Sequence, residues 1–390
     1  MQRPLCGSAS RQCSRVTAFV TLIGVAAVHW VLDPQSYLLG PRASQAAARR
    51  VAVVTVDNRN LTDVLETADY WTLSAVLNAG YAHARGYDFV YLQPLPLTAA
   101  SITAAQRDAA NVCEYPPWLL MGIGNDRPRS AEEEEALRKS PTGAKDVTQA
   151  VHLGRGAFRA ASWAKLPALW TLGSALYDTV LFLDSDAIVM RDGPFEDELQ
   201  RATPVYGTDA RAASFVALCN KPYWRPEMPS AGVFLWRPRP PGLDLLRRWW
   251  DGCGSDRKHA FEQDALWDIL DGAGARYEPR QAACPGGWPH LNRSTFVAVD
   301  TQQFSFFPER PHVWPNDSWV MHIGHGITEG LRVPEMRAQL KVRGVDAQAF
   351  AAAVASIRKQ HLRRVDCLAA ALEMHAASCV EARRCDPSMA

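Results

Sequence analysis

The chain has 390 residues, of which 47% are hydrophobic, 9% aromatic and 21% charged. This composition is that of a folded protein with a sizeable core, and it excludes a wholly disordered chain. The 42 basic and 41 acidic side chains give a formal net charge of +1. Because there is no basic surplus to neutralise a phosphate backbone, we expect no nucleic-acid partner.

An uncharged apolar segment lies near the start of the chain, at residues 16–32, between Arg15 and Asp33. Its 17 residues are at the short end of what a helix needs to cross a bilayer. Three arginines and no acidic residue precede it. We therefore predict a signal anchor at residues 16–32, with a cytoplasmic tail at residues 1–15 and a stem at residues 33–50. The alternative is a cleaved signal peptide.

This topology would make the chain a single-pass type II membrane protein, with everything after the stem in the lumen. A short span suits the thinner membranes of the early secretory pathway, so we expect the Golgi or the ER. Three N-glycosylation sequons lie in the predicted lumenal part, at Asn60, Asn292 and Asn316. The sequence thus predicts a membrane-anchored glycoprotein.

The predicted folded part begins with a strand, a helix and a second strand. Residues 51–56 form an apolar, β-branched run typical of a buried strand. Apolar residues at helical spacing follow from 73 to 84, and residues 88–92 form the next strand. Residues 127–146 are rich in Glu and predict a solvated or mobile insertion. A second helical pattern covers residues 163–176.

Further strands and helices follow in the same alternation. Adjacent Trp249 and Trp250 lie on one of these helices, so we expect only one of them to face inward. From Arg337 onward, an apolar stripe that includes Val365 predicts a helical extension. Strands are predicted at residues 179–183, 205–208, 215–218, 232–236 and 319–323, with helices at 243–250 and 261–270. The alternation predicts an α/β fold with a mostly parallel central sheet flanked by helices.

Two carboxylates follow the predicted strand at residues 179–183, in the sequence Asp184-Ser185-Asp186. Because side chains alternate along a strand, we expect both carboxylates to point the same way. The carboxyl end of a central parallel strand is where open α/β sheets bind ligands. Paired carboxylates there can hold a divalent cation that neutralises a diphosphate. Two Asp in a surface turn would give the same pattern.

Two classes of enzyme carry a strand followed by D-x-D. In phosphatases of the haloacid-dehalogenase type, the first Asp is a nucleophile, the motif usually opens the domain, and an acidic pair and a Lys follow it. In this chain a large predicted folded part precedes the motif, and no Asp-Asp pair follows on a predicted strand. Nucleotide-sugar glycosyltransferases of the GT-A fold place the motif in mid-domain, after a nucleotide-binding β-α-β half, which fits the predicted order better.

The residues around the motif resemble glycosyltransferase family 34, which includes galactosyl-, mannosyl- and xyloglucan xylosyltransferases. One segment is similar to that family because a W-A-K helix leads into a strand ending in D-S-D-A. Its sequence is SWAKLPALWTLGSALYDTVLFLDSDAIV. Upstream lies LNAGYAHARGYDFVYL, and downstream follow SAGVFLWRP, FEQDALWDIL and WVMHIGHG, in the family's order. The resemblance covers about residues 51–326. It implies a GT-A domain, which we place at residues 51–336, followed by an extension at residues 337–390.

The resemblance also implies a metal centre. Asp184 and Asp186 would hold Mn²⁺ or Mg²⁺ against the nucleotide diphosphate, and His322 would be the third protein ligand. An imidazole beside two carboxylates suits manganese in particular. A lone His on a buried strand is more often a core residue, and the D-x-D together with Gly324 favours the ligand role here.

Residues that contact the sugar donor are implied by the same resemblance. Lys165 would lie near the nucleotide-sugar, although an ordinary solvated Lys gives the same signal. Ser185 and His325 are further candidates for donor contacts. Gly232 would let the backbone approach the donor closely. Ser230 stands where the family more often has Asn, which leaves the donor sugar open.

The family places a Gln near the anomeric carbon, and Gln263 matches it. Glu262 stands where the family often has Asp, and Asp264 follows. Consecutive side chains on a helix point about 100° apart, so the three cannot all face one point. We expect Gln263, and then Glu262, to reach the site.

The implied activity is a retaining transfer of a sugar from a UDP- or GDP-sugar donor to a hydroxyl of a glycan or glycoprotein acceptor. The sequence shows no unmistakable nucleophile. This fits a front-face substitution, in which the departing phosphate helps to deprotonate the acceptor. The main alternative is a protein of the same fold that has lost turnover and serves as a membrane-tethered glycan-binding or scaffold protein. A phosphatase is the less favoured alternative.

Overall fold

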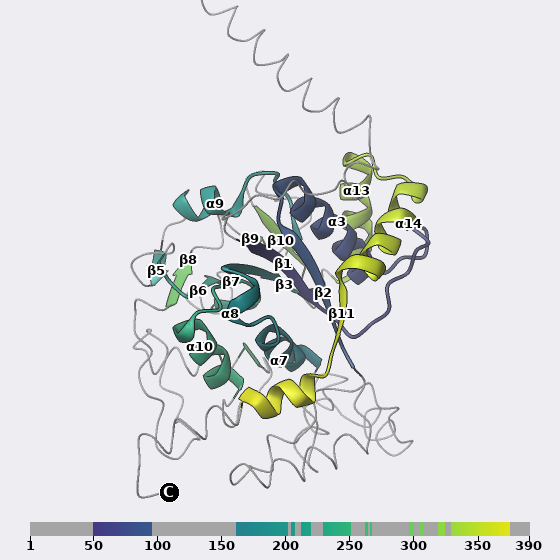
Figure 1. Cartoon of the computed structure of the whole chain (residues 1–390). Coiled ribbons are helices and arrows are strands. Elements are labelled where there is room, and N and C mark those ends of the chain that lie inside the picture. The colour runs from purple at the N-terminus through teal and green to yellow at the C-terminus, as the bar shows by residue number, and fades with distance from the viewer. Residues whose placement is uncertain are drawn as a thin grey trace, which may run out of the picture.

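The computed structural model describes the central part of the chain and one C-terminal segment (Figure 1). Within these residues, no helix is both long and apolar enough to cross a membrane. The predicted anchor at residues 16–32 and insertion at residues 127–146 lie outside them, as do Asp264 and His325, so these stay predictions. The described residues are 50–95, 161–201, 204–206, 212–219, 229–250, 262–263, 266, 296–299, 305–306, 319–323 and 329–374.

An eight-stranded sheet forms the centre of the molecule. Its strands are β1 (Val51–Val56), β2 (Asp88–Pro94), β3 (Thr179–Leu183), β5 (Pro204–Tyr206), β6 (Phe215–Cys219), β7 (Pro229–Trp236), β8 (Phe296–Val299) and β11 (Leu362–Val365). They are ordered β11-β2-β1-β3-β7-β6-β8-β5. The first four strands in this order run parallel, and β7 is antiparallel to both β3 and β6. The predicted mixed α/β fold with a mostly parallel sheet is confirmed.

Helices cover both faces of this sheet. The labelled α-helices are α3 (Tyr70–Arg85), α7 (Lys165–Trp170), α8 (Gly173–Leu176), α9 (Phe195–Arg201), α10 (Pro240–Trp250), α13 (Arg332–Val342) and α14 (Ala347–Ser356), and residues 367–374 are also helical. Figure 1 shows α3, α13 and α14 on one face and α7 and α10 on the other. Successive strand residues enter the two layers in turn. On β3, for example, Leu181 packs in the layer of α3 and α13, and Phe182 packs in the layer of α10.

A second, three-stranded sheet adjoins the carboxyl end of β3. It consists of β4 (Ala187–Val189), β10 (Val320–His322) and β9 (Ser305–Phe306), in that order. Helix α3 holds β4 through Asn78, whose amide donates to the carbonyl of Ala187 at 2.9 Å and accepts from the N–H of Val189 at 3.1 Å. Ser74 also donates to the carbonyl of Ala187, at 3.1 Å. This buried pairing fixes the strand that follows the D-x-D sequence.

The prediction that only one of Trp249 and Trp250 faces inward is wrong, because both side chains are buried. Trp249 packs edge-on against Phe215 of β6, with ring centroids 5.9 Å apart. Trp250 packs edge-on against Trp163 of the 3₁₀ turn η1 (Ala161–Ala164), at 6.1 Å. Helix α10 thus contacts both the sheet and the neighbouring η1–α7 segment, so two of its faces are covered.

The helical pattern predicted from Arg337 onward is confirmed in α13, α14 and residues 367–374, but it is wrong at Val365, which lies in a strand. Helix α14 passes through a π-turn, η4 (Ile357–His361), into β11, which pairs in parallel with β2. Leu362 packs against the layer of α3 and Val365 against the layer of α10. A spacing of three residues suits one face of a helix, but in a strand it reaches opposite faces, and both faces of this sheet are covered. The predicted boundary at residue 336 falls within α13.

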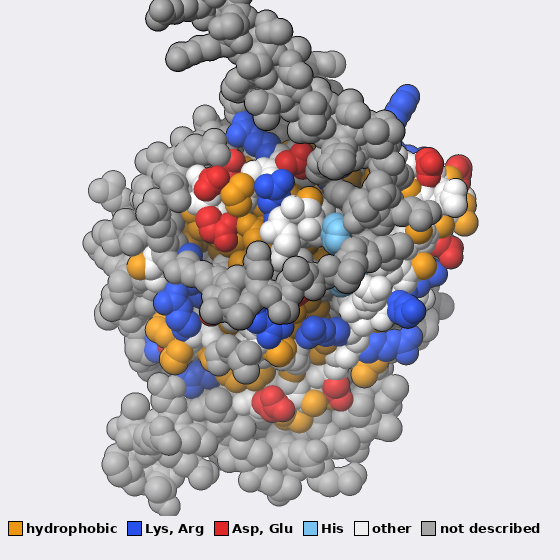
Figure 2. Space-filling view, turned by 45° about the horizontal axis from the view of Figure 1, so that its top comes forward, with side chains coloured by type: hydrophobic (Ala, Val, Ile, Leu, Met, Phe, Trp, Pro, Cys, Tyr) orange, Lys and Arg blue, Asp and Glu red, His pale blue; other side chains and the backbone are white. Residues whose placement is uncertain are grey.

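The surface mixes charges of both signs. Figure 2 shows Lys and Arg side chains together with Asp and Glu side chains over the described part of one face. This agrees with the net charge of +1.

Candidate functional site

The residues Asp184, Ser185 and Asp186 form a turn between β3 and β4. The N–H of Ala187 donates to the carbonyl of Asp184 at 2.9 Å, which closes the turn. The N–H of Asp184 donates to the carbonyl of Gly232 on β7 at 2.7 Å. The two carboxylates do converge, as predicted. The turn brings them together, however, and not the alternation of side chains along a continued strand.

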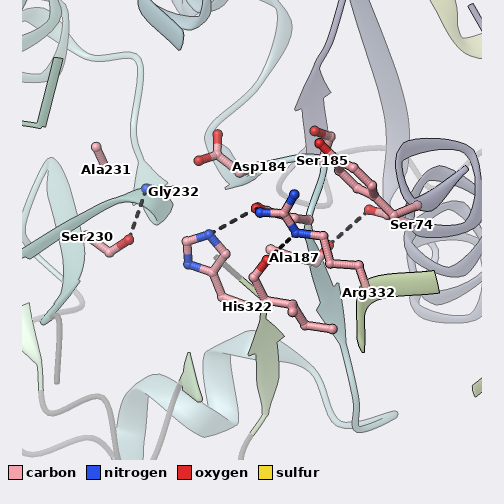
Figure 3. Close-up of polar contacts among 12 residues, drawn as sticks. Ser74, Asp184, Ser185, Ala187, Ser230, Ala231, Gly232, His322 and Arg332 are labelled. Carbon is pink, nitrogen blue, oxygen red and sulfur yellow. Dashed lines mark hydrogen bonds and ion pairs between the residues drawn. The ribbon is translucent and has the colours of Figure 1, made fainter. Parts of the chain in front are cut away.

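His322 meets these carboxylates because β10 pairs antiparallel with β4, with His322 opposite Ala187. The N–H of Ile323 donates to the carbonyl of Asp186 at 2.9 Å. The Nε2 atom of His322 lies 3.1 Å from Oδ1 of Asp186 (Figure 3). One ligand atom each from Asp184, Asp186 and His322 lies within 4.8 Å of the others. The structure therefore assembles the three residues that were predicted to hold a metal.

Gly232 closes one side of this cluster. A Cβ atom added to Gly232 would lie 2.5 Å from Cε1 of His322 and 2.7 Å from Oδ2 of Asp184. Neither distance is tolerated, so the close approach of β7 to the cluster requires a glycine. The N–H of Gly232 donates to Oγ of Ser230 at 3.1 Å, which directs the Ser230 hydroxyl oxygen to the backbone (Figure 3).

Lys165, at the start of α7, lies behind the cluster and not in solvent. Its side chain is 3% exposed. The ammonium group lies 3.0 Å from Oδ1 of Asp184, from the carbonyl of Ala231 and from Oε1 of Glu262. Burial alone would lower the pKa of Lys165, but the carboxylates of Asp184 and Glu262 outweigh burial and raise it. A charged Lys165 with three partners orients Asp184, and its predicted contact with a donor stays a prediction.

Asp184 itself is partly enclosed, with 30% of its side chain exposed. Burial raises the pKa of its carboxyl group; Lys165 opposes that rise, and the nearby Asp186 carboxylate adds to it. Two carboxyl groups this close disfavour each other's charged form. A cation between them relieves that repulsion.

Glu262 and Gln263 both lie beside the cluster. Glu262 pairs with Lys165, and its carbonyl accepts from Nε1 of Trp249 at 2.6 Å. The Oε1 atom of Gln263 accepts from the N–H of Ala231 at 2.9 Å. Of the three consecutive residues predicted here, the structure describes two: Gln263 contacts β7 at Ala231, next to Gly232, and Glu262 contacts Lys165. Their roles toward a donor stay predictions.

Arg332 is a residue of the site that the sequence prediction missed. It is the first residue of α13, and its side chain is 1% exposed. Its Nη2 donates to Oδ2 of Asp186 at 2.9 Å, and its Nε donates to the carbonyl of Ile323 at 2.6 Å. No sequence motif surrounds this Arg. Its place in the site depends on the pairing of β4 with β10, which brings the start of α13 to the turn, and that pairing cannot be read from the residues around position 332.

A second missed group follows β1. Asp57 is the first residue after that strand, and Arg59 donates from Nε to Oδ1 of Asp57 at 2.8 Å. Arg59 also donates from Nη2 to Oγ of Ser185 at 3.1 Å, and from Nη1 to the hydroxyl of Tyr70 at 2.8 Å. A signal existed in the sequence, since Asp57 follows an apolar strand as Asp184 does.

The cluster fits a divalent cation. Two carboxylate groups and an imidazole form a donor set of oxygen and nitrogen that Mn²⁺ accepts, and Mg²⁺ would use the oxygens. The missing Cβ at position 232 lets Oδ2 of Asp184 and the His322 ring lie against the backbone of β7, where a side chain would clash with them. Within the described part of the chain, this is the group of acidic, His or Cys residues placed to hold a metal ion.

No protein-family model matches this chain, and no curated protein matches its sequence. Among solved structures, one match is a glycosyltransferase involved in the glycosylation of the major capsid of PBCV-1. It is 12% identical, with a TM-score of 0.39, over 74% of this chain and 99% of that one. Another is mouse xyloside xylosyltransferase 1 in its apo form, which is 10% identical, with a TM-score of 0.32, over 72% and 98% of the two chains. Similarities this low do not show a family, so the functional assignment rests on the residues of the site.

Proposed function

We propose that this chain is a metal-dependent glycosyltransferase that moves a sugar from a UDP- or GDP-sugar to a hydroxyl of a glycan acceptor, with retention at the anomeric carbon. The observation that carries the proposal is the cluster of Asp184, Asp186 and His322 at the carboxyl end of β3. Its place at the edge of an open α/β sheet, where ligands of such sheets bind, supports a nucleotide donor.

In this proposal Asp184, Asp186 and His322 hold the cation. When bound, the cation supplies positive charge that stabilises the diphosphate as its bond to the sugar breaks. Lys165 keeps Asp184 oriented from behind, through its 3.0 Å contact. Ser185 lies between the two carboxylates on the same turn and contacts the donor, as does His325 beyond the described residues.

The sugar lies beside β7 in this proposal. Gln263 is held there by the N–H of Ala231 through its Oε1, so its amide nitrogen is the group that approaches the anomeric carbon. Glu262 acts through Lys165. The acceptor oxygen forms the new bond on the face that the phosphate leaves, and an oxygen of the leaving phosphate takes the acceptor's proton. No side-chain base is needed for this front-face step.

The cellular setting is a further part of the proposal. Residues 16–32 anchor the chain in the Golgi or ER membrane, and the stem at residues 33–50 presents residues 51–390 to lumenal donors and acceptors. The support is the uncharged apolar segment and the arginines that precede it.

The test is a screen of UDP- and GDP-sugars with the full-length chain in detergent and Mn²⁺, read out as nucleotide release. We expect release with one class of donor and its loss on chelation of the metal. A scaffold or glycan-binding protein of the same fold would release nucleotide from none of the donors. A phosphatase would release phosphate from a simple monoester without any nucleotide.

A further inference from the structure

We infer that Arg332 is a positioning residue for the metal site. Arg332 binds one oxygen of the Asp186 carboxylate and thereby presents the other oxygen to the cation. This inference rests on the proposed function, because it assigns a role toward the metal proposed there. It concerns a residue outside every motif that identified the site.

The contacts of Arg332 tie two of the predicted ligands together. Its Nη2 donates to Oδ2 of Asp186 at 2.9 Å, and its Nε donates at 2.6 Å to the carbonyl of Ile323, the residue after His322 (Figure 3). A single buried guanidinium thus fixes the side chain of one ligand and the backbone beside another. Because the guanidinium is planar and its donors are fixed in a fork, both contacts also set the orientation of the Asp186 carboxylate.

The two carboxylates of the site are held in the same manner. Lys165 binds Oδ1 of Asp184 at 3.0 Å, and Arg332 binds Oδ2 of Asp186. The remaining oxygen of each carboxylate faces His322. Oδ1 of Asp186 lies 3.1 Å from Nε2 of His322, and Oδ2 of Asp184 lies with the His322 ring against the missing Cβ of Gly232. In each carboxylate, one oxygen binds a buried cation and the other faces the third ligand.

The ring of Tyr70 supports this arrangement from α3. The guanidinium carbon of Arg332 lies 4.6 Å from the centre of that ring, and the guanidinium carbon of Arg59 lies 4.9 Å from it. Arg59 in turn donates to Oγ of Ser185. Lys165, Arg59 and Arg332 therefore hold the three consecutive residues of the turn, one cation to each residue. Aromatic contact favours guanidinium over ammonium at such a position.

The experiment measures the dissociation constant of Mn²⁺ by EPR titration of the full-length protein, without any donor. We expect Arg332→Lys to weaken Mn²⁺ binding about 10-fold and Arg332→Gln between about 10-fold and about 100-fold, the range seen when groups that orient metal ligands are removed. Lys should retain part of the affinity, because it keeps the charge but not the fork.

Arg343→Lys is the matched control. Arg343 follows α13 and donates to the carbonyl of Val189 at 2.6 Å, so it contacts the small sheet but no ligand. We expect its Mn²⁺ affinity to stay within about twofold of the wild type, well below the effects on groups that orient ligands. Circular dichroism and thermal melts of each variant separate loss of fold from loss of affinity, because a purely structural Arg332 would lower the melting temperature and leave the affinity of the folded protein unchanged.

The outcomes separate this inference from the proposed function. A wild-type protein that binds no Mn²⁺ overturns the proposed metal site itself. Wild-type binding that is matched by both Arg332 variants overturns the positioning role and leaves the proposed function standing. If neither Arg332 variant folds, Tyr70→Leu removes the ring that Arg332 contacts. It should weaken Mn²⁺ binding about threefold, as a loss of roughly 0.6 kcal/mol of cation–π contact implies, and unchanged affinity there would likewise overturn the inference.

Discussion

The turns that follow β1 and β3 occupy equivalent positions, yet their carboxylates are used differently. The two strands are adjacent and parallel, so both turns lie at the same edge of the sheet. After β1, Asp57 is paired with Arg59, which comes two residues later in the same loop, and both of its oxygens are bound. After β3, the carboxylates of Asp184 and Asp186 are held by cations from the distant helices α7 and α13.

This difference shows that the position of a carboxylate and its availability to a ligand have separate causes. The end of a parallel strand determines where a carboxylate lies. The source of its cation determines whether an oxygen remains for a ligand: Arg59 takes both oxygens of Asp57, while Lys165 contacts one oxygen of Asp184. The exposed fractions of the two side chains differ in the same sense: the side chain of Asp57 is 3% exposed and that of Asp184 is 30% exposed.

The largest effect should come from removing one charge at the turn after β3. Asp186→Asn should lower Mn²⁺-dependent nucleotide release at least about 100-fold, because the site loses a charged ligand of the cation that stabilises the leaving diphosphate. The amide oxygen can still accept from Arg332, so the fold should persist. Kinetics with Mn²⁺ and a thermal melt measure the two effects. Activity equal to the wild type in the Asn variant would remove Asp186 from the metal site.

Lys165→Met should destabilise the folded protein by about 3 kcal/mol, because it leaves Asp184 and Glu262 without their buried cation. The pKa of Lys165 is raised in the folded state: burial alone would lower it, but the two carboxylates outweigh burial. A pKa above that of the unfolded chain means that the stabilisation is complete below about pH 10 and is lost as the pH rises through the folded value.

The measurement is urea unfolding of the wild type and the Lys165→Met variant at several pH values. The difference in unfolding free energy should be constant between about pH 7 and about pH 9 and shrink only in more alkaline solution. A difference that already shrinks between those two values would show that Lys165 loses its proton there and is not held by the carboxylates.

The sequence predicted the parts of the fold that depend on local pattern. The runs at 51–56 and 179–183 are strands with the predicted bounds, since their β-branched and apolar residues are buried on both faces. That His322 would meet the D-x-D turn was implied by the resemblance to a known family, and the structure brings the three residues together. The strand patterns predict correctly because the same residues determine both the secondary structure of the segment and its burial.

What could not be predicted depends on contacts between distant segments. Val365 looked helical because nothing local shows that it adds a strand to β2. For Lys165 the sequence left two readings open, a contact with the donor or a solvated side chain, and neither includes its partners Asp184 and Glu262, which lie elsewhere in the sequence. Arg332 lies in no motif. Its role follows from the approach of α13 to a turn in which its partner Asp186 lies 146 positions earlier in the chain. Ion pairs between residues far apart in the chain therefore cannot be predicted from a single sequence.

Gly232→Ala tests the space that the turn after β3 shares with β7. The added Cβ would lie 2.5 Å from the His322 ring, so we expect a loss of about 1–3 kcal/mol in unfolding free energy, typical of overpacking, together with weaker Mn²⁺ binding. Gly330→Ala is the control, because a Cβ there would meet nothing within 4 Å. Melting temperatures and Mn²⁺ titrations of both variants measure the contrast. Equal behaviour of the two would mean that β7 does not press on the cluster.

The smallest effect should come from the turn after β1. In Asp57→Asn, Arg59 keeps its bonds to Tyr70 and Ser185 and loses a charged partner. The side chain of Arg59 is 33% exposed, so water replaces part of the lost interaction and the cost in unfolding free energy should be only about 1 kcal/mol. Mn²⁺ affinity should be unchanged, because Asp57 contributes no oxygen to the cluster. If Asp57→Asn instead weakens Mn²⁺ binding as much as Arg332→Lys does, then Arg59 transmits the charge of Asp57 to Ser185, and the two turns act as one site.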